Sequence, residues 1–449
     1  MNKTRYLTAI GLLALAGHGL AAVGDQEAAR LGKELTPIGA ERAGNKDGSI
    51  PEWKGGLPKG KHKLGDARVD PFAADKPMFS IDANNVDKYK DKLSDGAVEL
   101  IRTRKGYRMD VYPTQRSCGY PDSVYTQTRQ NATLAKLTTD GKDNLAQAVG
   151  GGFPFAIPKS GAEAVWNHRL RWQGEGRIEY YQTNFINPDG TFYGLAQDQW
   201  LITPFASAKA KSIDDVGDVQ MKILNVATAP ASRTGEVIMA HYFLNKGNDA
   251  WMYFPGQRRV RRLPAFEYDN PIPGYENLET ADQYPMFAGM LDRYNWKLVG
   301  KQEMYIPYNS FKFVAKRKVS EVYGGLYPNR DLMRYELHRV WVVEATLKAG
   351  QKHIYGKRVF YLDEDSWNVL EEDSYDTRGQ LWRVGIHGLR QNYDALVPWH
   401  SVQAWHDLTN GNYLVTHLDN EISQPIVFGK KAKWSDFQPD ALRRAGGTR

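Results

Sequence analysis

From about residue 177 onward, hydrophobic and polar residues alternate with a period of two. Residues 335–347 are the clearest example, because Leu337, Trp341 and Val343 share one parity while Glu336 and His338 share the other. Such alternation predicts a strand with one apolar face and one solvated face. The same pattern predicts strands at residues 235–244, 250–254, 259–263, 296–303, 311–319, 357–362, 369–375, 381–386 and 413–418. Tandem strands favour one large antiparallel sheet, which curls as its twist accumulates.

Helical periodicity is confined to a few segments. Apolar residues recur at three- and four-residue spacing over residues 86–100, behind the capping residues Asn84 and Asn85, which predicts an amphipathic helix. Residues 132–149 and 161–172 are further predicted helices, and a short one is expected at 285–294. The predicted fold class is therefore α+β, a large curved antiparallel sheet covered by helices. We expect the helices at 86–100, 132–149 and 285–294 to form a lid over a lined cavity.

The two ends of the chain differ from this body. Lys3 and Arg5 precede an apolar run that reaches Leu20 and ends in small residues, which predicts a secretory signal peptide at 1–22. The run is too short for a membrane span of about 20 residues, so no membrane-spanning segment is expected. Residues 23–80 are rich in Gly, Pro and Lys and predict an extended N-terminal arm. The sheet with its lid is assigned to residues 81–430 and a C-terminal tail to 431–449.

Composition excludes several classes of protein. The 449 residues include 59 Lys and Arg against 52 Asp and Glu, a formal net charge of +7 that is spread along the chain. Such a surplus is too weak to predict a nucleic-acid partner. Cys118 is the only cysteine, so no intramolecular disulfide and no thiolate metal cluster can form. We expect Cys118 to be a small buried residue rather than a reactive thiol.

Motifs for catalysis and cofactor binding are missing. The chain contains neither Gly-x-Ser-x-Gly nor His-Glu-x-x-His. His400 and His406 lie six residues apart, which is not metal-ligand spacing on a helix. We therefore assign no metal, no cofactor and no catalytic residue, and the protein is not expected to be an enzyme.

Two acidic segments imitate functional sites. Residues 45–50 resemble the middle of a calcium loop, but Ala43 and Lys54 occupy the end positions that require Asp and Glu. A turn is the favoured interpretation. Residues 363–366 and 371–373 bring acidic groups onto neighbouring strands, and their composition favours an exposed hairpin turn over a catalytic carboxylate pair.

A basic segment follows the aromatic residues 251–256. In a strand, Arg259 and Arg261 point one way while Arg258 and Arg262 point the other. In the simplest interpretation, one of these pairs lies on a solvated face and forms ion pairs with acidic neighbours. The other pair is a candidate contact for a lipid headgroup, an acidic ligand or an acidic partner surface.

Several of these segments resemble a known family. Residues 251–262, 361–367 and 375–382 resemble successive strands of outer-membrane lipoprotein-sorting proteins of the LolA/LolB type. The chain from about 35 to 428 is more closely similar to a large proteobacterial periplasmic family of unknown function in that superfamily, as residues 39–53 and 287–298 indicate. The resemblance implies an incomplete, strongly curved LolA/LolB-like half-barrel that holds an acyl chain or another hydrophobic molecule. It also implies a free periplasmic protein that works with an RND-type (MMPL-like) transporter and an outer-membrane protein.

The leading hypothesis is a periplasmic carrier for a lipid or other hydrophobic molecule. Its expected lining residues are Met239, Trp251, Tyr253, Trp341 and Val343, with Arg259 and Arg261 near the mouth. A carbohydrate-binding or polysaccharide-processing protein is the second hypothesis, because exposed rings on a sheet stack on sugars. A scaffold between an RND-type exporter and the outer membrane, without a ligand, is the third.

Overall fold

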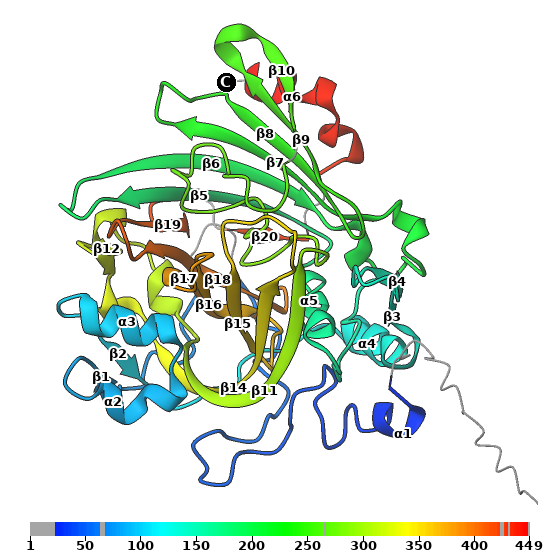
Figure 1. Cartoon of the computed structure of the whole chain (residues 1–449), viewed down its shortest axis with the longest axis vertical. Coiled ribbons are helices and arrows are strands. Elements are labelled where there is room, and N and C mark those ends of the chain that lie inside the picture. The colour runs from blue at the N-terminus through cyan, green and yellow to red at the C-terminus, as the bar shows by residue number, and fades with distance from the viewer. Residues whose placement is uncertain (1–22, 63–67, 265, 423–425, 430–431, 448–449) are drawn as a thin grey trace, which may run out of the picture.

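The computed structural model describes residues 23–62, 68–264, 266–422, 426–429 and 432–447. The predicted signal peptide lies outside the described residues. Within them, sixteen strands form one open sheet (Figure 1). Its main path runs β1 (Phe79–Ile81), β2 (Met109–Val111), β14 (Tyr335–Leu347), β15 (Lys357–Asp363), β16 (Val369–Tyr375), β17 (Leu381–Asn392), β18 (Val397–Asp407), β19 (Tyr413–Leu418), β5 (Gly176–Ile186), β6 (Phe192–Ile202), β7 (Val219–Ala229), β8 (Val237–Phe243), β9 (Asp249–Phe254) and β10 (Arg259–Leu263).

Two strands lie off this path. The long strand β11 (Tyr294–Pro307) pairs with β14, and the short strand β20 (Val427–Phe428) pairs with β5. Among the described strands of this sheet, β2 and β14 pair in parallel and the other neighbours are antiparallel. Figure 1 shows β11 and β14 curving together at one end of the sheet. The predicted fold class, a large open antiparallel sheet with helices, is confirmed.

Helices and small hairpins surround the sheet. The helices are α1 (Asp25–Ala28), α2 (Val86–Tyr89), α3 (Asp95–Thr103), α4 (Asp122–Leu134), α5 (Gly161–Arg169) and α6 (Pro439–Gly447), and the small hairpins are β3 (Lys136–Leu137) with β4 (Leu145–Gln147) and β12 (Tyr323–Gly324) with β13 (Tyr327–Pro328). Helix α5 confirms the prediction for residues 161–172. The predicted helix at 86–100 is interrupted: Leu93 is extended, and the Ser94 Oγ accepts the Ala97 N–H and starts α3.

Three sequence predictions of regular structure are wrong. Residues 132–149 hold only the end of α4 and the hairpin β3–β4, and residues 311–319 form short 3₁₀ turns rather than a strand. Residues 285–293 are irregular instead of helical. Phe287 and Leu291 are buried as their spacing predicts, but Met286 and Ala288, on either side of Phe287, are buried as well. The segment is therefore enclosed on all sides, and packing rather than helical periodicity sets its course.

The two faces of the sheet have different covers. Cross-strand pairing places Val343, Phe360, Trp405 and Phe185 on one face, and these residues share an apolar core with Trp166 of α5. We call this side the α5 face. The opposite side is covered by α2 and α3 near β16 and β17 and by α6 near β8, β9 and β10. Figure 1 shows α6 beside these last three strands.

The predicted solvated face of residues 335–347 is wrong for the first half of the strand, whereas Glu344 is half-buried and Thr346 is exposed. Glu336 and His338 are buried. The Arg334 guanidinium pairs with Glu336, and the His338 ring stacks on Tyr308 at 3.8 Å between centroids. Tyr308 directly follows β11, which pairs with β14, so ion pairs and rings replace water around Glu336 and His338.

Candidate functional site

A cavity of about 410 Å³ lies between the sheet and the C-terminal residues. Trp200, Leu224 and Val226 form its floor on β6 and β7. Its cover comes from residues 432–445 and contributes three alanines together with Asp436 and Arg444. The volume falls in the range of about 300–1,000 Å³ that is typical of small-molecule sites. Apolar walls with one acidic and one basic group favour a largely hydrophobic ligand.

The sequence explains why α6 covers this part of the sheet. Ala441 and Leu442 are buried and Ala445 is half-buried, so one side of the helix is apolar. Pro439 is its first residue, where a missing N–H costs nothing. Gly446 allows close contact, because a Cβ there would come within 2.6 Å of the Tyr253 ring.

Two polar contacts attach the segment before α6. The Nε2 of His241 lies 2.9 Å from the Phe437 carbonyl oxygen. Burial and the charge of Lys222 lower the pKa of His241 to about 4, so the ring is neutral at pH 7 and donates through Nε2. The Lys222 ammonium lies 3.6 Å from the centre of the Trp434 ring. The cover is thus held at its N-terminal end by one hydrogen bond and one cation–π contact.

Three of the predicted lining residues adjoin this cavity. Met239 is the cross-strand partner of Leu224, and Trp251 is the partner of Met239. Met239 and Tyr253 are buried in one apolar cluster with Phe437 and Leu442, and Trp251 packs against it. These residues belong to the apolar cluster beside the cavity and do not line it.

The other predicted site residues lie elsewhere. Val343 is on the α5 face, and Trp341 packs against the same core with its ring stacked on Trp367. Arg259 and Arg261 are exposed on β10, and they share a face with Phe254 and Met252, opposite to Met239. The structure therefore does not bring all seven residues into one site. Sequence reasoning missed the cover, because residues 431–449 were assigned to a tail although Ala441, Leu442 and Ala445 follow helical spacing.

The α5 face holds a second, much smaller cavity. Residues 266–284 cross β7 and β8 there and leave a space of about 40 Å³ beside Tyr181, Tyr242 and Tyr275. This volume suits one water molecule rather than an acyl chain. The irregular segment 266–293 is therefore a packed cover, in place of the predicted helical lid at 285–294.

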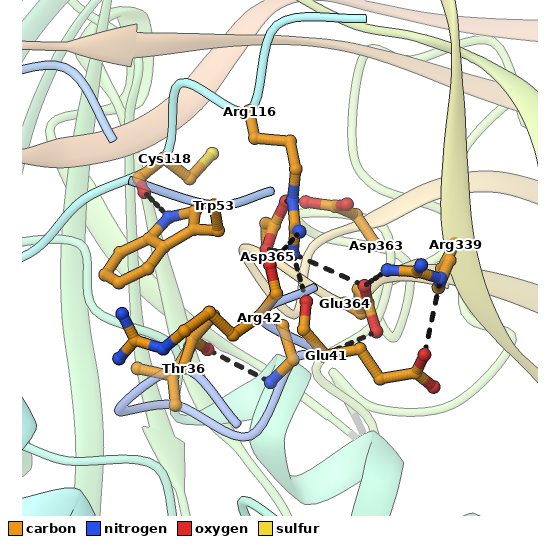
Figure 2. Close-up of polar contacts among 12 residues, drawn as sticks. Thr36, Glu41, Arg42, Trp53, Arg116, Cys118, Arg339, Asp363, Glu364 and Asp365 are labelled. Atoms are coloured by element: carbon orange, nitrogen blue, oxygen red, sulfur yellow. Dashed lines mark hydrogen bonds and ion pairs between the residues drawn. The ribbon is translucent and has the colours of Figure 1, made fainter. Parts of the chain in front are cut away.

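The acidic turn after β15 is buried, so the predicted exposed hairpin turn is wrong. Asp363, Glu364 and Asp365 are at most 3% exposed. Figure 2 shows the Arg116 side chain lying against this turn. Its Nε and Nη2 each donate to a different oxygen of Asp365 at 2.7 Å, and Nη2 also donates to the Glu41 carbonyl oxygen at 2.8 Å. The N-terminal arm and Arg116 together replace water around the turn.

A buried carboxyl group lies beside this ion pair. Burial and the charge of Asp365 raise the pKa of Asp363 to about 7. Its Oδ2 accepts hydrogen bonds from Ser366 and Tyr308. The Sγ of Cys118 lies 2.9 Å from the Tyr308 hydroxyl, and burial raises the pKa of this thiol well above its usual value. Cys118 is therefore buried and un-ionised at neutral pH, as predicted, and is a poor nucleophile.

The acidic residues of β16 anchor α3. The Ser94 hydroxyl donates to Glu371 at 2.5 Å, and the backbone N–H of Gly96 donates to Asp373 at 3.0 Å. Both groups lie at the N-terminus of the helix, and burial raises the pKa of both, that of Glu371 to about 7. These carboxylates hold a helix in place, which is a structural role.

Comparison with known proteins identifies the family. Residues 80–443 match the family described as protein of unknown function (DUF1329). An uncharacterized protein of Pseudomonas aeruginosa is 43% identical over 459 residues, covering 99% of this chain and all of the relative. The chain belongs to this family, which confirms the resemblance to a large family of unknown function.

Solved structures are similar at lower identity. A putative outer membrane lipoprotein-sorting protein domain from Vibrio parahaemolyticus is 17% identical with a TM-score of 0.46, covering 64% of this chain and 99% of that one. A DUF1329 family protein from Desulfovibrio piger is 14% identical with a TM-score of 0.42, covering 60% and 92%. A LolA superfamily protein from Nitrosomonas europaea is 12% identical with a TM-score of 0.38, covering 63% and 99%. In the described part of the chain, every helix is too short or too polar to cross a membrane.

Proposed function

We propose that this protein is a periplasmic carrier that binds a lipid or another hydrophobic molecule between α6 and the sheet. The observation that carries the proposal is the cavity of about 410 Å³ with its apolar floor of Trp200, Leu224 and Val226. Burial of apolar ligand surface supplies the affinity, at about 0.8 kcal/mol per methylene group. Binding without chemical conversion is the proposed activity.

The cover provides a route for entry and release. Helix α6 makes most of its contacts with the outer strands β8, β9 and β10 and the neighbouring turns. A partner that displaces the contacts of Phe437 and Trp434 would open the cavity and release the ligand. Arg259 and Arg261 lie on the opposite face of β10, away from the cavity, and are the proposed contacts for an acidic partner surface. An RND-type (MMPL-like) transporter and an outer-membrane protein are the proposed partners, and co-purification tests them.

The first experiment asks whether the native protein carries a ligand. Protein purified from the native periplasm is extracted with organic solvent, and the extract is examined by mass spectrometry. We expect one class of hydrophobic molecule, at a molar ratio to the protein of about one. Saturated fatty acids of increasing length then compete with a fluorescent fatty-acid probe. Each added methylene is expected to tighten binding about fourfold until the cavity is full.

Two matched variants locate the site. Ala445 lines the cavity and is half-buried, whereas Arg443 is exposed on the same helix. Ala445→Trp fills the cavity and is expected to abolish probe binding, while Arg443→Trp adds the same side chain to the outer surface and is expected to bind as wild type. Equal binding by both variants, or an empty native protein that takes up no probe, would contradict the proposal.

The carbohydrate-binding hypothesis receives less support. Among the described residues, the large exposed rings are Phe192, Tyr193 and Trp434. Phe192 and Tyr193 are neighbours on one strand and point to opposite sides of it. They therefore do not form one flat stacking surface for a sugar.

A further inference from the structure

Three histidines and one glutamate from four neighbouring strands meet inside the protein. They are His387 on β17, His400 on β18, His417 on β19 and Glu179 on β5, and these strands are adjacent in this order. All four side chains are buried. Glu179 and His417 are 238 residues apart in the sequence, so local spacing could not reveal the cluster.

Three of these side chains have the spacing of metal ligands. The Oε1 of Glu179 lies 3.4 Å from Nε2 of His400 and 3.0 Å from Nδ1 of His417. One ligand atom from each residue lies within 4.8 Å of the other two. In a tetrahedral site with zinc–ligand distances of about 2.0–2.1 Å, neighbouring ligand atoms are about 3.3 Å apart. A small shift of the side chains would admit an ion between them.

A backbone irregularity aims the His417 ring. The pairing of β19 with β5 shifts register between Val415 and Leu418, and His417 lies within this shift with a φ of 61°. A left-handed conformation is uncommon for a residue other than glycine and costs energy. The ring stacks on Tyr181 with 4.5 Å between centroids. Bulges of this kind redirect side chains and are frequent next to functional sites.

Unpartnered nitrogens point to a missing ligand. His387 is fully buried, and neither of its ring nitrogens has a hydrogen-bond partner among the described residues. Its ring centroid lies 5.3 Å from that of His400, whose Nδ1 is also without a partner. A neutral imidazole has one donor and one acceptor, and leaving both unsatisfied in the interior is costly. An ion that took a nitrogen of His387 would remove part of this cost.

The surroundings hold the glutamate in a ligating position. The Nε of Arg177 lies 3.3 Å from Oε2 of Glu179, which leaves Oε1 toward the histidines. The Arg177 guanidinium lies 4.1 Å from the centre of the Trp399 ring and also donates to Tyr284. Outer contacts of this kind orient a ligand for a metal.

We propose that Glu179, His400 and His417 bind a divalent transition-metal ion of the zinc class, and that the His387 ring shifts toward His400 to give the fourth donor. Imidazole nitrogens with one carboxylate suit Zn²⁺ and its neighbours, whereas Ca²⁺ and Mg²⁺ prefer oxygen ligands. The site joins four strands in the middle of the sheet, and the ion would stabilise this region. The proposal does not depend on the hydrophobic ligand.

The test uses the full chain, unfolded and refolded with Zn²⁺ or with a chelator and then dialysed. We expect about one equivalent of zinc per chain by elemental analysis, and a higher Tm for the zinc-loaded protein than for the chelated protein. Refolding with Co²⁺ is expected to give the intense visible absorption of a tetrahedral Co²⁺ site. Zinc that dialyses away, together with an absent Co²⁺ band, would overturn the proposal.

Variants assign the ligands. His400→Gln and His417→Gln keep a group that donates a hydrogen bond to Glu179, and each is expected to lose the metal. His406 is a buried histidine on the same strand as His400 and stacks on Tyr413 outside the cluster. His406→Gln is the control and is expected to keep the metal. Retention of the full zinc content by both ligand variants would overturn the assignment, and the Co²⁺ spectrum of the wild type decides the question if the variants do not fold.

Discussion

Replacing Arg116 by methionine tests how the buried acidic turn is stabilised. The Arg116 side chain is 2% exposed, and so are those of Glu364 and Asp365. Its two hydrogen bonds to Asp365 and its bond to the Glu41 carbonyl would all be lost. Asp365 would remain buried beside Asp363 without a counter-charge. Breaking such a pair from one side costs about 3–5 kcal/mol.

An exposed pair of the same chemistry is the control. Arg378 lies 2.9 Å from Asp376, and its side chain is 81% exposed. Arg378→Met is expected to change the free energy of unfolding by less than about 0.5 kcal/mol, since exposed pairs contribute little. Urea unfolding followed by tryptophan fluorescence measures both variants.

A double variant separates loss of the pair from loss of packing. Asp365→Asn removes the charge that Arg116→Met leaves unpaired, so the double variant is expected to be more stable than Arg116→Met alone. The reasoning would be refuted if Arg116→Met unfolded within about 1 kcal/mol of Arg378→Met, because a buried unpaired carboxylate should cost more.

Two further predictions concern α3 and α6. Burial raises the pKa of Glu371 from 4.5 to about 7. The protonated side chain therefore contributes fully to the stability of the folded protein below about pH 4.5, and this contribution is lost as the pH rises through about 7. Glutamine does not titrate, so Glu371→Gln lacks this pH-dependent loss. Between pH 4.5 and 8, the free energy of unfolding of the variant should rise by at most about 3 kcal/mol relative to that of the wild type. Parallel pH profiles of the two proteins in urea would contradict this. A Cβ at Gly446 would lie 2.4 Å from the Gly235 carbonyl oxygen, so Gly446→Val should displace α6 and weaken fatty-acid probe binding, whereas Gly447→Val, with open space around it, should not.

The strands with clear alternation were predictable from the sequence. The prediction for residues 335–347 matches β14 at both ends, and 369–375 and 413–418 match β16 and β19. The sequence does not show which groups cover a strand. Glu336 and Glu364 look solvated in isolation, but in the interior Glu336 pairs with Arg334, two residues before it, and Glu364 pairs with Arg116, which is 248 residues away.

The candidate sites depended on contacts that no local pattern records. Met239 and Tyr253 were identified from strand periodicity, whereas their cover is a nine-residue helix at the far end of the chain. The histidine cluster combines residues from four strands, and each histidine alone looks like an ordinary core residue. Pairing order across the sheet, which the sequence leaves open, decides both arrangements.

Strand β10 ends the main path of the open sheet. An open sheet has unpaired N–H and C=O groups at its edge, which invite another chain to add a strand and begin fibrous aggregation. Here Arg259, Arg261 and Arg262 are exposed along that edge. Two copies that approached edge to edge would bring these positive charges together, so the basic segment keeps neighbouring molecules apart in a crowded compartment.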